Sequence, residues 1–575
     1  MKNYYEIRIS ITLTIVFIGL LVTNSAVIAQ SENQTRDKAP VLEVFGDEYV
    51  PSLRENHPTS PAYKFSTPGF FTVQVNVNEQ GENIVGDAAN EPSIAFDPTD
   101  PNKIAIGWRQ FDNINNNFRQ AGIGFSTDAG ETWTFPGVIN PGVFRSDPVL
   151  DSDKEGNFYY NSLTATEEDY WCDVYKSEDG GESWDNGTYA FGGDKQWMTI
   201  DKSGGDGSGN IYAFWNSYYS ICEPDHFTRS VDGGGSFEDC ISVPGYPIWG
   251  TTVVSGEGEL YVCGLVWGEN FIVAKSSTAQ NAGQPVIWDF STSIDLNGEL
   301  VGFGGYDCPN PSGLLGQTII TVDSSGGPSH GNVYLLASVD PYTGQDPLDV
   351  MFTRSTDGGL TWSLPIKVND DIGTNAYQWL GTMSVAPDGR IDVVWLDTRD
   401  NPGTVWSVLY YSYSLDAGNT WSENTPLTEA FDPHVGWPQQ EKMGDYFDMY
   451  SDETGAHLAW ANTFNGEQDV YYAYITPSTV GISNSRIQQD VVLYQNYPNP
   501  VRNSTVIRYR LAAKAHVSLK VFDMMGREVA VLVNEVQQAG ISQVDFIVDD
   551  LENGVYYYRL DAGNYSETKK LLIID

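Results

Sequence analysis

Residues 126–133 read Ser-Thr-Asp-Ala-Gly-Glu-Thr-Trp, and the same octet pattern returns four times along the chain. The other copies are SEDGGESW at 177–184, SVDGGGSF at 230–237, STDGGLTW at 355–362 and SLDAGNTW at 414–421. Each octet lies between two β-rich runs and is expected to form a hairpin loop. There the Asp can accept backbone hydrogen bonds, Gly allows a positive φ, and the aromatic ring covers apolar surface. The octet aspartates are therefore predicted to stabilise turns: Asp128, Asp179, Asp232, Asp357 and Asp416.

The octet resembles the Asp-box, or BNR repeat, of the sialidase superfamily of β-propellers, and the resemblance covers roughly residues 70–476. It implies an all-β propeller in which the octets lie on outer hairpins, on the face opposite the ligand site. The composition, rich in Gly, Tyr and Trp, suits many short strands joined by tight turns.

The number of blades is predicted from inner hairpins, in which a strand, an Asp/Gly turn and a second strand follow one another. Seven such hairpins begin at Glu91, Asp147, Trp197, Gly250, Gln317, Gly381 and Gly444. We therefore expect seven blades, with six as the alternative, because sialidases of the family generally have six. The lone strand at 71–77 is expected to pair with 469–475 and so close the ring.

The N-terminus has the pattern of a secretory signal peptide. Lys2 and Arg8 precede an apolar run from Ile9 to Val22, and small residues lead to a cleavage site after Ala29. Residues 30–69 are interpreted as a linker or strap. No later segment is apolar over the length of a membrane span, so the mature protein is expected to lack one.

Residues 490–575 differ from the rest in charge, with nine Lys and Arg against eleven Asp and Glu, so the acidity lies upstream. After a linker at 477–489, alternating strands predict a small β-sandwich. The YQNYPNP run at 494–500, VFDMMGREV from Val521, GVYYY at 554–558 and the terminal KKLLI resemble the type A sorting domain of the type IX secretion system. This resemblance implies contact with that machinery and a secreted or outer-membrane surface location in a Gram-negative bacterium.

The net charge of −45 excludes nucleic acid as a partner, because phosphate binding needs clustered cations. No HExxH, CxxC or P-loop motif occurs, so neither a metal nor another cofactor is expected, and a monomer is predicted. Five cysteines follow the signal peptide, which leaves at least one unpaired. A Cys172–Cys222 bridge is predicted, since both residues fall in loops expected to be neighbours in adjacent blades.

Ligands of a propeller bind on the face opposite the octets. A sialidase needs three arginines for the substrate carboxylate, a Tyr–Glu nucleophile pair and an Asp acid/base, because guanidinium groups bind carboxylates through two hydrogen bonds. The candidates for catalysis on this face are Arg109, Arg145, Arg399, Asp397 and Glu441. The Arg-Ile-Pro signature usual in sialidases is missing, and a salt bridge to a loop carboxylate is the alternative role of each arginine.

The same face is predicted to present aromatic and acidic side chains, which suit the stacking and hydrogen bonding of sugar rings. The candidates for ligand binding are Trp197, Trp249, Trp379, Trp437, Asp194 and Asp445, and Trp108, Asp147 and Asp400 are placed there too. The alternative for each Trp is a wedge between blades. Three functions stay open: a glycan- or polysaccharide-binding surface protein, an exo-α-sialidase or other glycoside hydrolase, and a non-catalytic adhesion or scaffold protein.

Overall fold

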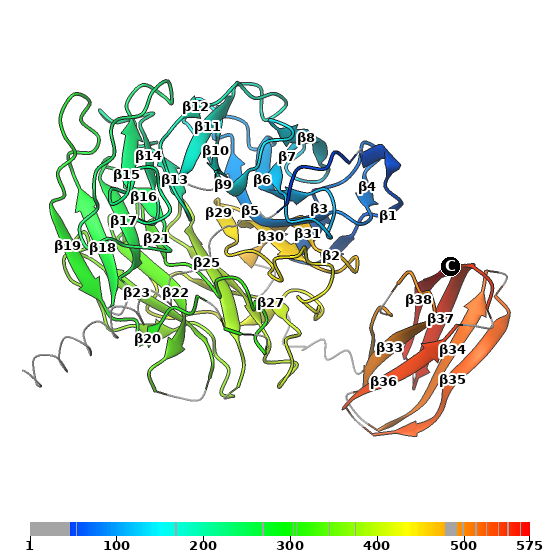
Figure 1. The fold of residues 1–575 in the computed structure, drawn as a ribbon. Helices are drawn as coiled ribbons and strands as arrows, with labels where there is room; N and C mark the ends of the chain where they lie inside the picture. The colour runs from blue at the N-terminus through cyan, green and yellow to red at the C-terminus, as the bar shows by residue number, and fades with distance from the viewer. Residues whose placement is uncertain are drawn as a thin grey trace, which may run out of the picture. The chain divides into compact units, whose positions relative to one another are not determined.

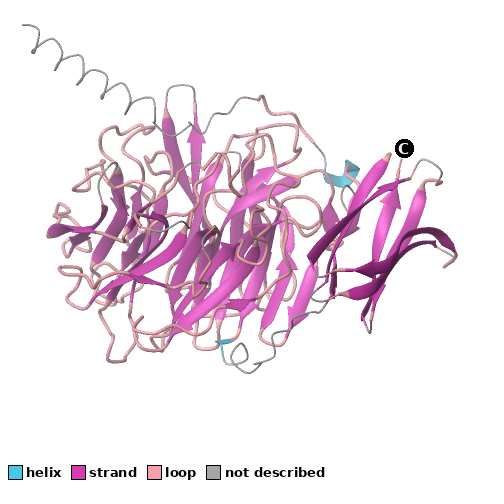
Figure 2. Ribbon diagram, turned by 90° about the horizontal axis from the view of Figure 1, so that it is seen from below, coloured by secondary structure: helices cyan, strands magenta, loops and turns pink. Residues whose placement is uncertain are grey.

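The computed structural model describes residues 47–574, except for short gaps. The gaps are Leu53, 167–168, 267–269, Phe303, Tyr306, 344–345, Thr374, 478–490, 497–498, 512–513, Met525, Ala539, 549–550 and Asn564. The predicted signal peptide, strap residues 30–46 and nearly all of the linker after Pro477 lie outside the described residues. Strands dominate the rest (Figure 2), and η1 (Arg54–Asn56) is a single 3-10 turn. No helix within these described ranges is long and apolar enough to cross a membrane.

Antiparallel sheets follow one another along the chain, each built in sequence order (Figure 1). The first contains β5 (Ala88–Phe96), β6 (Ile104–Phe111), β7 (Gln120–Ser126) and β8 (Thr134–Ile139). The second contains β9 (Ser146–Ser152), β10 (Phe158–Ala165), β11 (Tyr170–Ser177) and β12 (Thr188–Tyr189). The third contains β13 (Trp197–Ile200), β14 (Ile211–Phe214) and β15 (Phe227–Ser230).

The next three sheets repeat this plan. The fourth contains β16 (Thr252–Val254), β17 (Leu260–Leu265), β18 (Phe271–Ser276) and β19 (Phe290–Ile294). The fifth contains β20 (Gly298–Glu299), β21 (Ile319–Val322), β22 (Val333–Pro341), β23 (Asp349–Ser355) and β24 (Ile366–Lys367). The sixth contains β25 (Gln378–Val385), β26 (Ile391–Asp397), β27 (Val408–Ser414) and β28 (Thr425–Pro426).

The seventh sheet joins the two ends of the repeat region. It has the order β2 (Lys64–Thr67), β3 (Phe70–Gln74), β31 (Asp469–Ile475), β30 (Ala456–Asn462) and β29 (Asp448–Ser451). The predicted pairing of the lone strand with 469–475 is confirmed, with Phe70 opposite Ile475. The sequence did not predict β2, nor the pair β1 (Thr59–Pro61) and β4 (Glu82–Ile84), because these short polar runs show no clear alternation.

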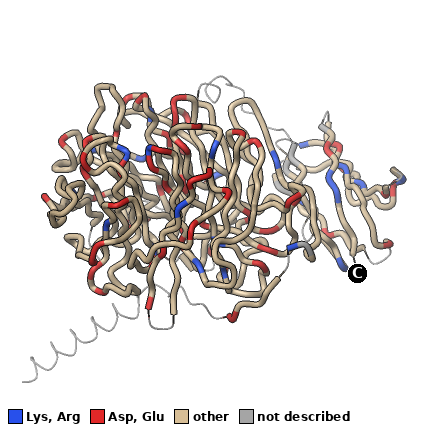
Figure 3. Tube along the Cα trace, turned by 90° about the horizontal axis from the view of Figure 1, so that it is seen from above, with Lys and Arg blue, Asp and Glu red and all other residues tan. Residues whose placement is uncertain are grey.

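The fold is a β-propeller. The innermost strand of each sheet contacts the innermost strand of the next, from β5 through β9, β13, β16, β21, β25 and β29, and β29 contacts β5. The inner strands β13, β16, β21, β25 and β29 line a central cavity of about 150 Å³. We call the face that carries the connections from each outermost strand to the next innermost strand the upper face. Asp and Glu occur throughout the propeller loops (Figure 3).

The C-terminal region is a two-sheet sandwich. One sheet has the order β32 (Val491–Leu493), β33 (Ser504–Leu511) and β36 (Gly540–Ile547). The other has the order β35 (Glu528–Gln537), β34 (Ala515–Asp523), β37 (Gly554–Ala562) and β38 (Tyr565–Ile573). Their inner faces share one core, in which Ile507 and Tyr509 pack with Val517, Leu519 and Leu560.

The five octets form the same turn on the face opposite the upper face. In the first, the Asp128 carboxylate accepts hydrogen bonds from the Thr132 N–H at 2.9 Å and from the Thr132 hydroxyl at 2.6 Å. The Ser126 hydroxyl donates to Asp128 at 2.8 Å and accepts from the Gly130 N–H at 2.9 Å. Asp179, Asp232, Asp357 and Asp416 make the same contacts. Each octet Asp therefore acts within its own turn.

The disulfide prediction is wrong. Cys222 is bonded to Cys240, and their Cα atoms are 6.2 Å apart, within the range that a disulfide spans. Cys172 is instead buried on β11, where its side chain lies against the backbone of Gly192. The connections after β14 and after the third octet bring Cys222 and Cys240 together within the third sheet, a proximity that spacing along the chain does not reveal.

Candidate functional site on the upper face

A strained backbone conformation recurs where the innermost strands begin. Glu91, Asp147 and Lys195 have φ of 50°, 46° and 55°, and Trp249 and Leu380 have 52° and 51°. Such positive φ values cost about 1–3 kcal/mol in residues other than Gly and persist only where the surroundings fix them. Because five sheets share the feature, it belongs to the architecture of the ring. At Glu91, Asp147 and Lys195 it places the side chain against charged residues of other sheets.

Three neighbouring sheets place charged residues at this position, and they meet four more charged side chains. We call this group the axial cluster: Glu91, Arg109, Asp147, Asp194, Lys195, Lys442 and Asp445. Every member is buried, and the most exposed, Lys195, retains only 7% of its accessible surface.

The ammonium groups of the axial cluster each bridge carboxylates from different sheets. Lys442 Nζ lies 3.2 Å from Glu91 Oε1 and 2.7 Å from Asp445 Oδ2. Lys195 Nζ lies 2.6 Å from the same Asp445 oxygen, and Arg109 Nε lies 3.1 Å from Glu91 Oε2. The contacts link the first, third and seventh sheets, so the cluster ties the ring together at its upper end.

Two further carboxylates complete the cluster around Lys195. Its Nζ lies 3.5 Å from Asp147 Oδ2 and 3.9 Å from Asp194 Oδ1. Asp194 also accepts a hydrogen bond from Asn216 Nδ2 at 2.9 Å, and Asp147 accepts one from the Ser146 hydroxyl at 2.7 Å. These partners fix both carboxylates where the second and third sheets adjoin.

Burial and the cations divide the carboxylates into two kinds. Burial raises the pKa of Glu91 to about 7 despite Arg109 and Lys442, and burial with the nearby Asp147 and Asp445 raises the pKa of Asp194 to about 6. Burial opposes ionisation of Asp147 too, but Lys195, Arg109 and Lys442 outweigh it and lower its pKa to about 2. Lys195 and Lys442 likewise hold the pKa of Asp445 well below its usual range. The cluster thus contains carboxyl groups with raised pKa values and carboxyl groups with lowered pKa values side by side.

The connection between β28 and β29 runs from the buried axial cluster to the surface of the protein. Lys442 and Asp445 form its root, whereas Trp437 is half-buried and stacks on His434 with ring centroids 4.6 Å apart and planes at 27°. The loop is also held by Gln439, whose Nε2 donates to the Asn115 carbonyl at 2.6 Å. Glu441, with a φ of 53°, is partly exposed between the aromatic pair and the root.

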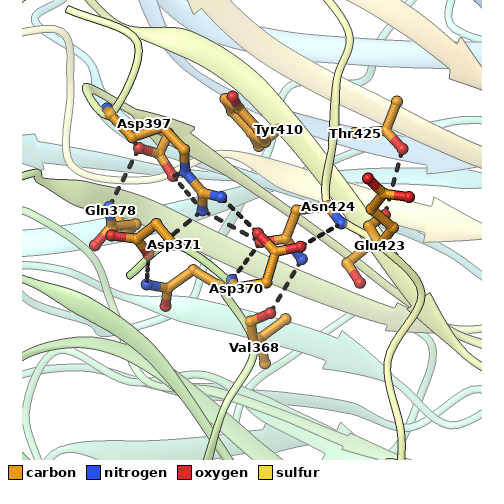
Figure 4. Close-up of polar contacts among 12 residues, drawn as sticks. Val368, Asp370, Asp371, Gln378, Asp397, Tyr410, Glu423, Asn424 and Thr425 are labelled. Carbon is orange, nitrogen blue, oxygen red and sulfur yellow. Dashed lines mark hydrogen bonds and ion pairs between the residues drawn. The ribbon is translucent and has the colours of Figure 1, made fainter. Parts of the chain in front are cut away.

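The predicted arginines do not share one site. Arg109 lies in the axial cluster, whereas Arg145 Nη1 pairs with Asp173 at 2.8 Å and Arg145 Nη2 donates to the Tyr175 hydroxyl at 2.5 Å. Arg399 Nη2 lies 2.8 Å from Asp397 Oδ2, and its Nη1 lies 2.7 Å from Asp370 Oδ1. Figure 4 shows Asp397, Asp370 and Asp371 gathered in this network. Each arginine is therefore engaged by carboxylates of its own surroundings.

Most of the predicted aromatic platforms are buried. Trp249 and Trp379 expose 1% and 0% of their surface, and Trp197 exposes 9% and meets the Tyr446 ring edge-on at 5.4 Å. Trp249 and Trp379 thus occupy the alternative position between sheets, whereas Trp197 lines the central cavity. A ligand-binding role of these three stays a prediction. Trp437 alone of the four predicted tryptophans is accessible. Asp194 and Asp445 are brought together around Lys195, and Asp397 is bonded to Arg399.

Glu91, Lys195 and Lys442 are not among the site residues predicted from the sequence. A signal was present for two of them, because Glu91, Asp147 and Lys195 each stand six residues before the Asp of an inner turn, at Asp97, Asp153 and Asp201. Aligning the inner hairpins in this frame brings three charged residues to one position. Lys442 has no such signal, since it belongs to an irregular connection.

Residues 495–574 match the secretion system C-terminal sorting domain family. The chain therefore carries the sorting domain of the type IX secretion system, which indicates export to the cell surface or beyond. No curated protein matches the chain.

Several solved structures are similar to the chain at low identity. A protein of unknown function from Dyadobacter fermentans is 14% identical, with a TM-score of 0.38, and the match covers 71% of this chain and all of that one. An α-L-arabinanase from Penicillium chrysogenum is 10% identical, with coverages of 74% and 99% and a TM-score of 0.36. A sialidase from Trypanosoma rangeli is 9% identical, with coverages of 86% and 86% and a TM-score of 0.35. At these values the likenesses say nothing about the activity of this chain.

Proposed function

We propose that this protein is an exported propeller that binds neutral glycans on its upper face. The observation that carries the proposal is the loop that presents Trp437 stacked on His434 while its root is fixed in the axial cluster. An accessible aromatic ring beside hydrogen-bonding side chains is the combination that sugar rings need. Export by the sorting domain would bring this face to extracellular polysaccharides.

The charges favour a neutral ligand over an acidic one. Glu441 lies in the same loop, and Arg109, Arg145 and Arg399 are all paired with carboxylates. An anionic sugar would have to displace one of those carboxylates while entering a protein of net charge −45. We therefore rank sialic acid binding behind neutral glycans.

The test is binding of the full-length mature chain to a panel of neutral and acidic polysaccharides. Trp437→Ala should lower the affinity for a neutral polysaccharide by about tenfold, because the stacking surface is lost. Tyr246→Ala is the matched comparison, since Tyr246 also stacks on a histidine, His226, with centroids 5.2 Å apart, but on the upper-face connection between the third and fourth sheets. It therefore separates the loop that carries Trp437 from the rest of the upper face. Equal affinity of the wild type and Trp437→Ala would refute the proposed face.

A glycoside hydrolase is the second candidate, and the divided carboxylates favour it. Glycosidases pair a protonated with an ionised carboxyl group, and the axial cluster contains both kinds, in Glu91 with a pKa of about 7 and in the ionised Asp445. Both groups are buried, so this candidate requires that the loop between β28 and β29 moves to admit the substrate. Glu91→Gln should then abolish turnover of the bound polysaccharide and leave binding in place. Turnover of a fluorogenic sialoside that is lost in Arg399→Ala but kept in Asp357→Ala would instead favour the sialidase alternative.

A further inference from the structure

A groove of about 350 Å³ lies at the outer side of the first two sheets, between β8 and the second octet. Its floor includes Val138, Tyr175 and Trp184, and its rim includes Asn140, Asp185 and Asn186. It belongs to the periphery of the propeller, because β8 and β12 are the outermost strands of their sheets (Figure 1). The groove is therefore separate from the upper-face loop that carries Trp437.

The second octet holds its tryptophan differently from the first and fourth octets. In the first and fourth octets the indole Nε1 of Trp133 and Trp362 donates to the carbonyl of the octet glycine at 3.1 Å. Trp184 Nε1 has no hydrogen-bond partner within the described residues. Its ring meets Tyr160 edge-on at 5.9 Å and remains half-buried against the groove. Within the described residues, the Trp184 indole is thus not hydrogen-bonded to its own turn, unlike the indoles of Trp133 and Trp362.

The polar groups around the ring are fixed in place. The Tyr175 hydroxyl accepts hydrogen bonds from Arg145 Nη2 at 2.5 Å and Asn140 Nδ2 at 3.5 Å. Asp185 Oδ1 accepts from the backbone N–H groups of Lys176 and Gly187 at 3.0 and 2.9 Å. Tyr175, Asn140 and Asp185 are therefore held in place before a ligand binds, which lowers the ordering cost of binding, whereas Asn186 has no hydrogen bond within the described residues.

The groove lining favours a neutral ligand. Glu182 and Asp185 both line it, and no Lys or Arg occurs among the described lining residues. A sulfated or carboxylated sugar would be repelled by these carboxylates, whereas the hydroxyl groups of a neutral sugar can donate to them. A volume of about 350 Å³ is at the lower end of ligand pockets and suits a short stretch of a saccharide chain.

We propose that this groove is a second carbohydrate-binding site, which holds a short neutral segment of a polysaccharide against Trp184. The site would let one propeller grip a polymer at two points. This raises the effective concentration of the second contact, and avidity exceeds the affinity of either site alone. The site stands independently of the upper face, because its residues and contacts are all different.

The experiment compares two octet tryptophans in the full-length mature chain. Trp421 is the matched control for Trp184, because its Nε1 also has no partner among the described residues and its ring meets Phe352 edge-on at 5.1 Å. Trp421 does not line the groove. Binding of a neutral polysaccharide, such as laminarin, xylan or mannan, is measured by titration calorimetry and affinity electrophoresis. We expect Trp184→Ala to weaken binding by about tenfold and to lower the stoichiometry, and Trp421→Ala to do neither.

A second variant separates binding from folding. Asn186→Ala removes a rim amide for which no structural hydrogen bond occurs among the described residues, and should weaken binding while leaving the melting temperature unchanged. Equal affinities of Trp184→Ala and Trp421→Ala would overturn the proposal, as would stronger binding of acidic than of neutral polysaccharides. Loss of binding in Trp437→Ala alone would overturn the groove and leave the upper-face proposal standing. Loss in Trp184→Ala and Asn186→Ala alone would do the reverse.

Discussion

Two groups of carboxylates in this propeller, the first buried and the second buried or half-buried, meet their surroundings in opposite ways. The axial cluster interleaves its carboxylates with Arg109, Lys195 and Lys442. The seam group, Asp87, Glu467 and Asp469, lies where the two ends of the ring join. Within the described residues, none of these three forms an ion pair with Lys or Arg.

In the seam group, side-chain amides take the place of cations as the partners of the carboxylates. Gln110 Nε2 donates to Asp87 at 2.9 Å, Asn83 Nδ2 donates to Glu467 at 2.8 Å, and Asn76 Nδ2 donates to Asp469 at 2.7 Å.

The pKa values show the consequence of this difference. Burial and the neighbouring Glu467 raise the pKa of Asp469 to about 8, and burial with Asp469 and Glu467 raises that of Asp87 well above its usual range. In the axial cluster, the cations outweigh burial at Asp147 and Asp445. Burial therefore favours a neutral carboxyl group, and the neighbouring cations outweigh burial at Asp147 and Asp445 but not at Glu91 and Asp194.

The largest effect should come from removing a cation of the axial cluster. Lys195→Met would leave Asp147, Asp194 and Asp445 without their shared ammonium, and breaking a buried ion pair by removing one partner costs about 3–5 kcal/mol. Urea unfolding at pH 7 measures this loss. Adding Asp147→Asn to the variant should restore part of the stability, because Lys195 is the ammonium paired with Asp147, whereas Asp445 keeps Lys442. A loss below about 1 kcal/mol would show that the cluster is not a structural tie.

A pH series should separate the two groups next. Asp469 has a raised pKa, so its contribution to stability is complete below pH 4 and is lost as the pH rises through about 8. Between these values the slope is about 1.4 kcal/mol per pH unit for one proton. Asp469→Asn should remove most of this slope and stabilise the ring at pH 8.

Asp445→Asn, the same type of substitution in the axial cluster, is the control for Asp469→Asn. Asp445 has a lowered pKa, so its contribution is present above pH 4 and disappears in acid. Asp445→Asn should therefore destabilise the protein at neutral pH, opposite in sign to Asp469→Asn. Comparing each variant with wild type removes the general repulsion of an acidic chain. If both variants shift stability in the same direction, the distinction between the two groups fails.

The periodic part of this molecule could be predicted from the sequence. The octets and inner hairpins repeat, so a shared frame predicts strands such as β26 and the closing pair of β3 with β31. The sequence could not show which tryptophans are exposed, because exposure depends on contacts between sheets: Trp379, within β25, is buried, whereas Trp437, in the connection before β29, is half-buried.

Only part of the axial cluster could be predicted from the sequence, for the same reason. Asp194 and Asp445 were predicted as separate ligand-binding residues, and Lys195 was passed over beside Asp194. Their partnership depends on side chains of different sheets meeting across the ring, a distance in space that no spacing along the chain encodes. The Cys222–Cys240 bridge escaped prediction likewise, since it depends on two irregular connections of one sheet.

The smallest effect should come from the same type of substitution at an exposed pair. Lys176 Nζ lies 2.8 Å from Glu178 Oε1, as close as the contacts of the axial cluster, but the two side chains are 29% and 74% exposed. Water screens such a pair, so Lys176→Met should change the free energy of unfolding by less than about 1 kcal/mol. The change should shrink further in 1 M NaCl, because the screening length then falls to about 3 Å. Equal losses of unfolding free energy in Lys176→Met and Lys195→Met would mean that contact distance, not burial, sets the strength of these ion pairs. That result would contradict the contrast between the axial cluster and the surface pair.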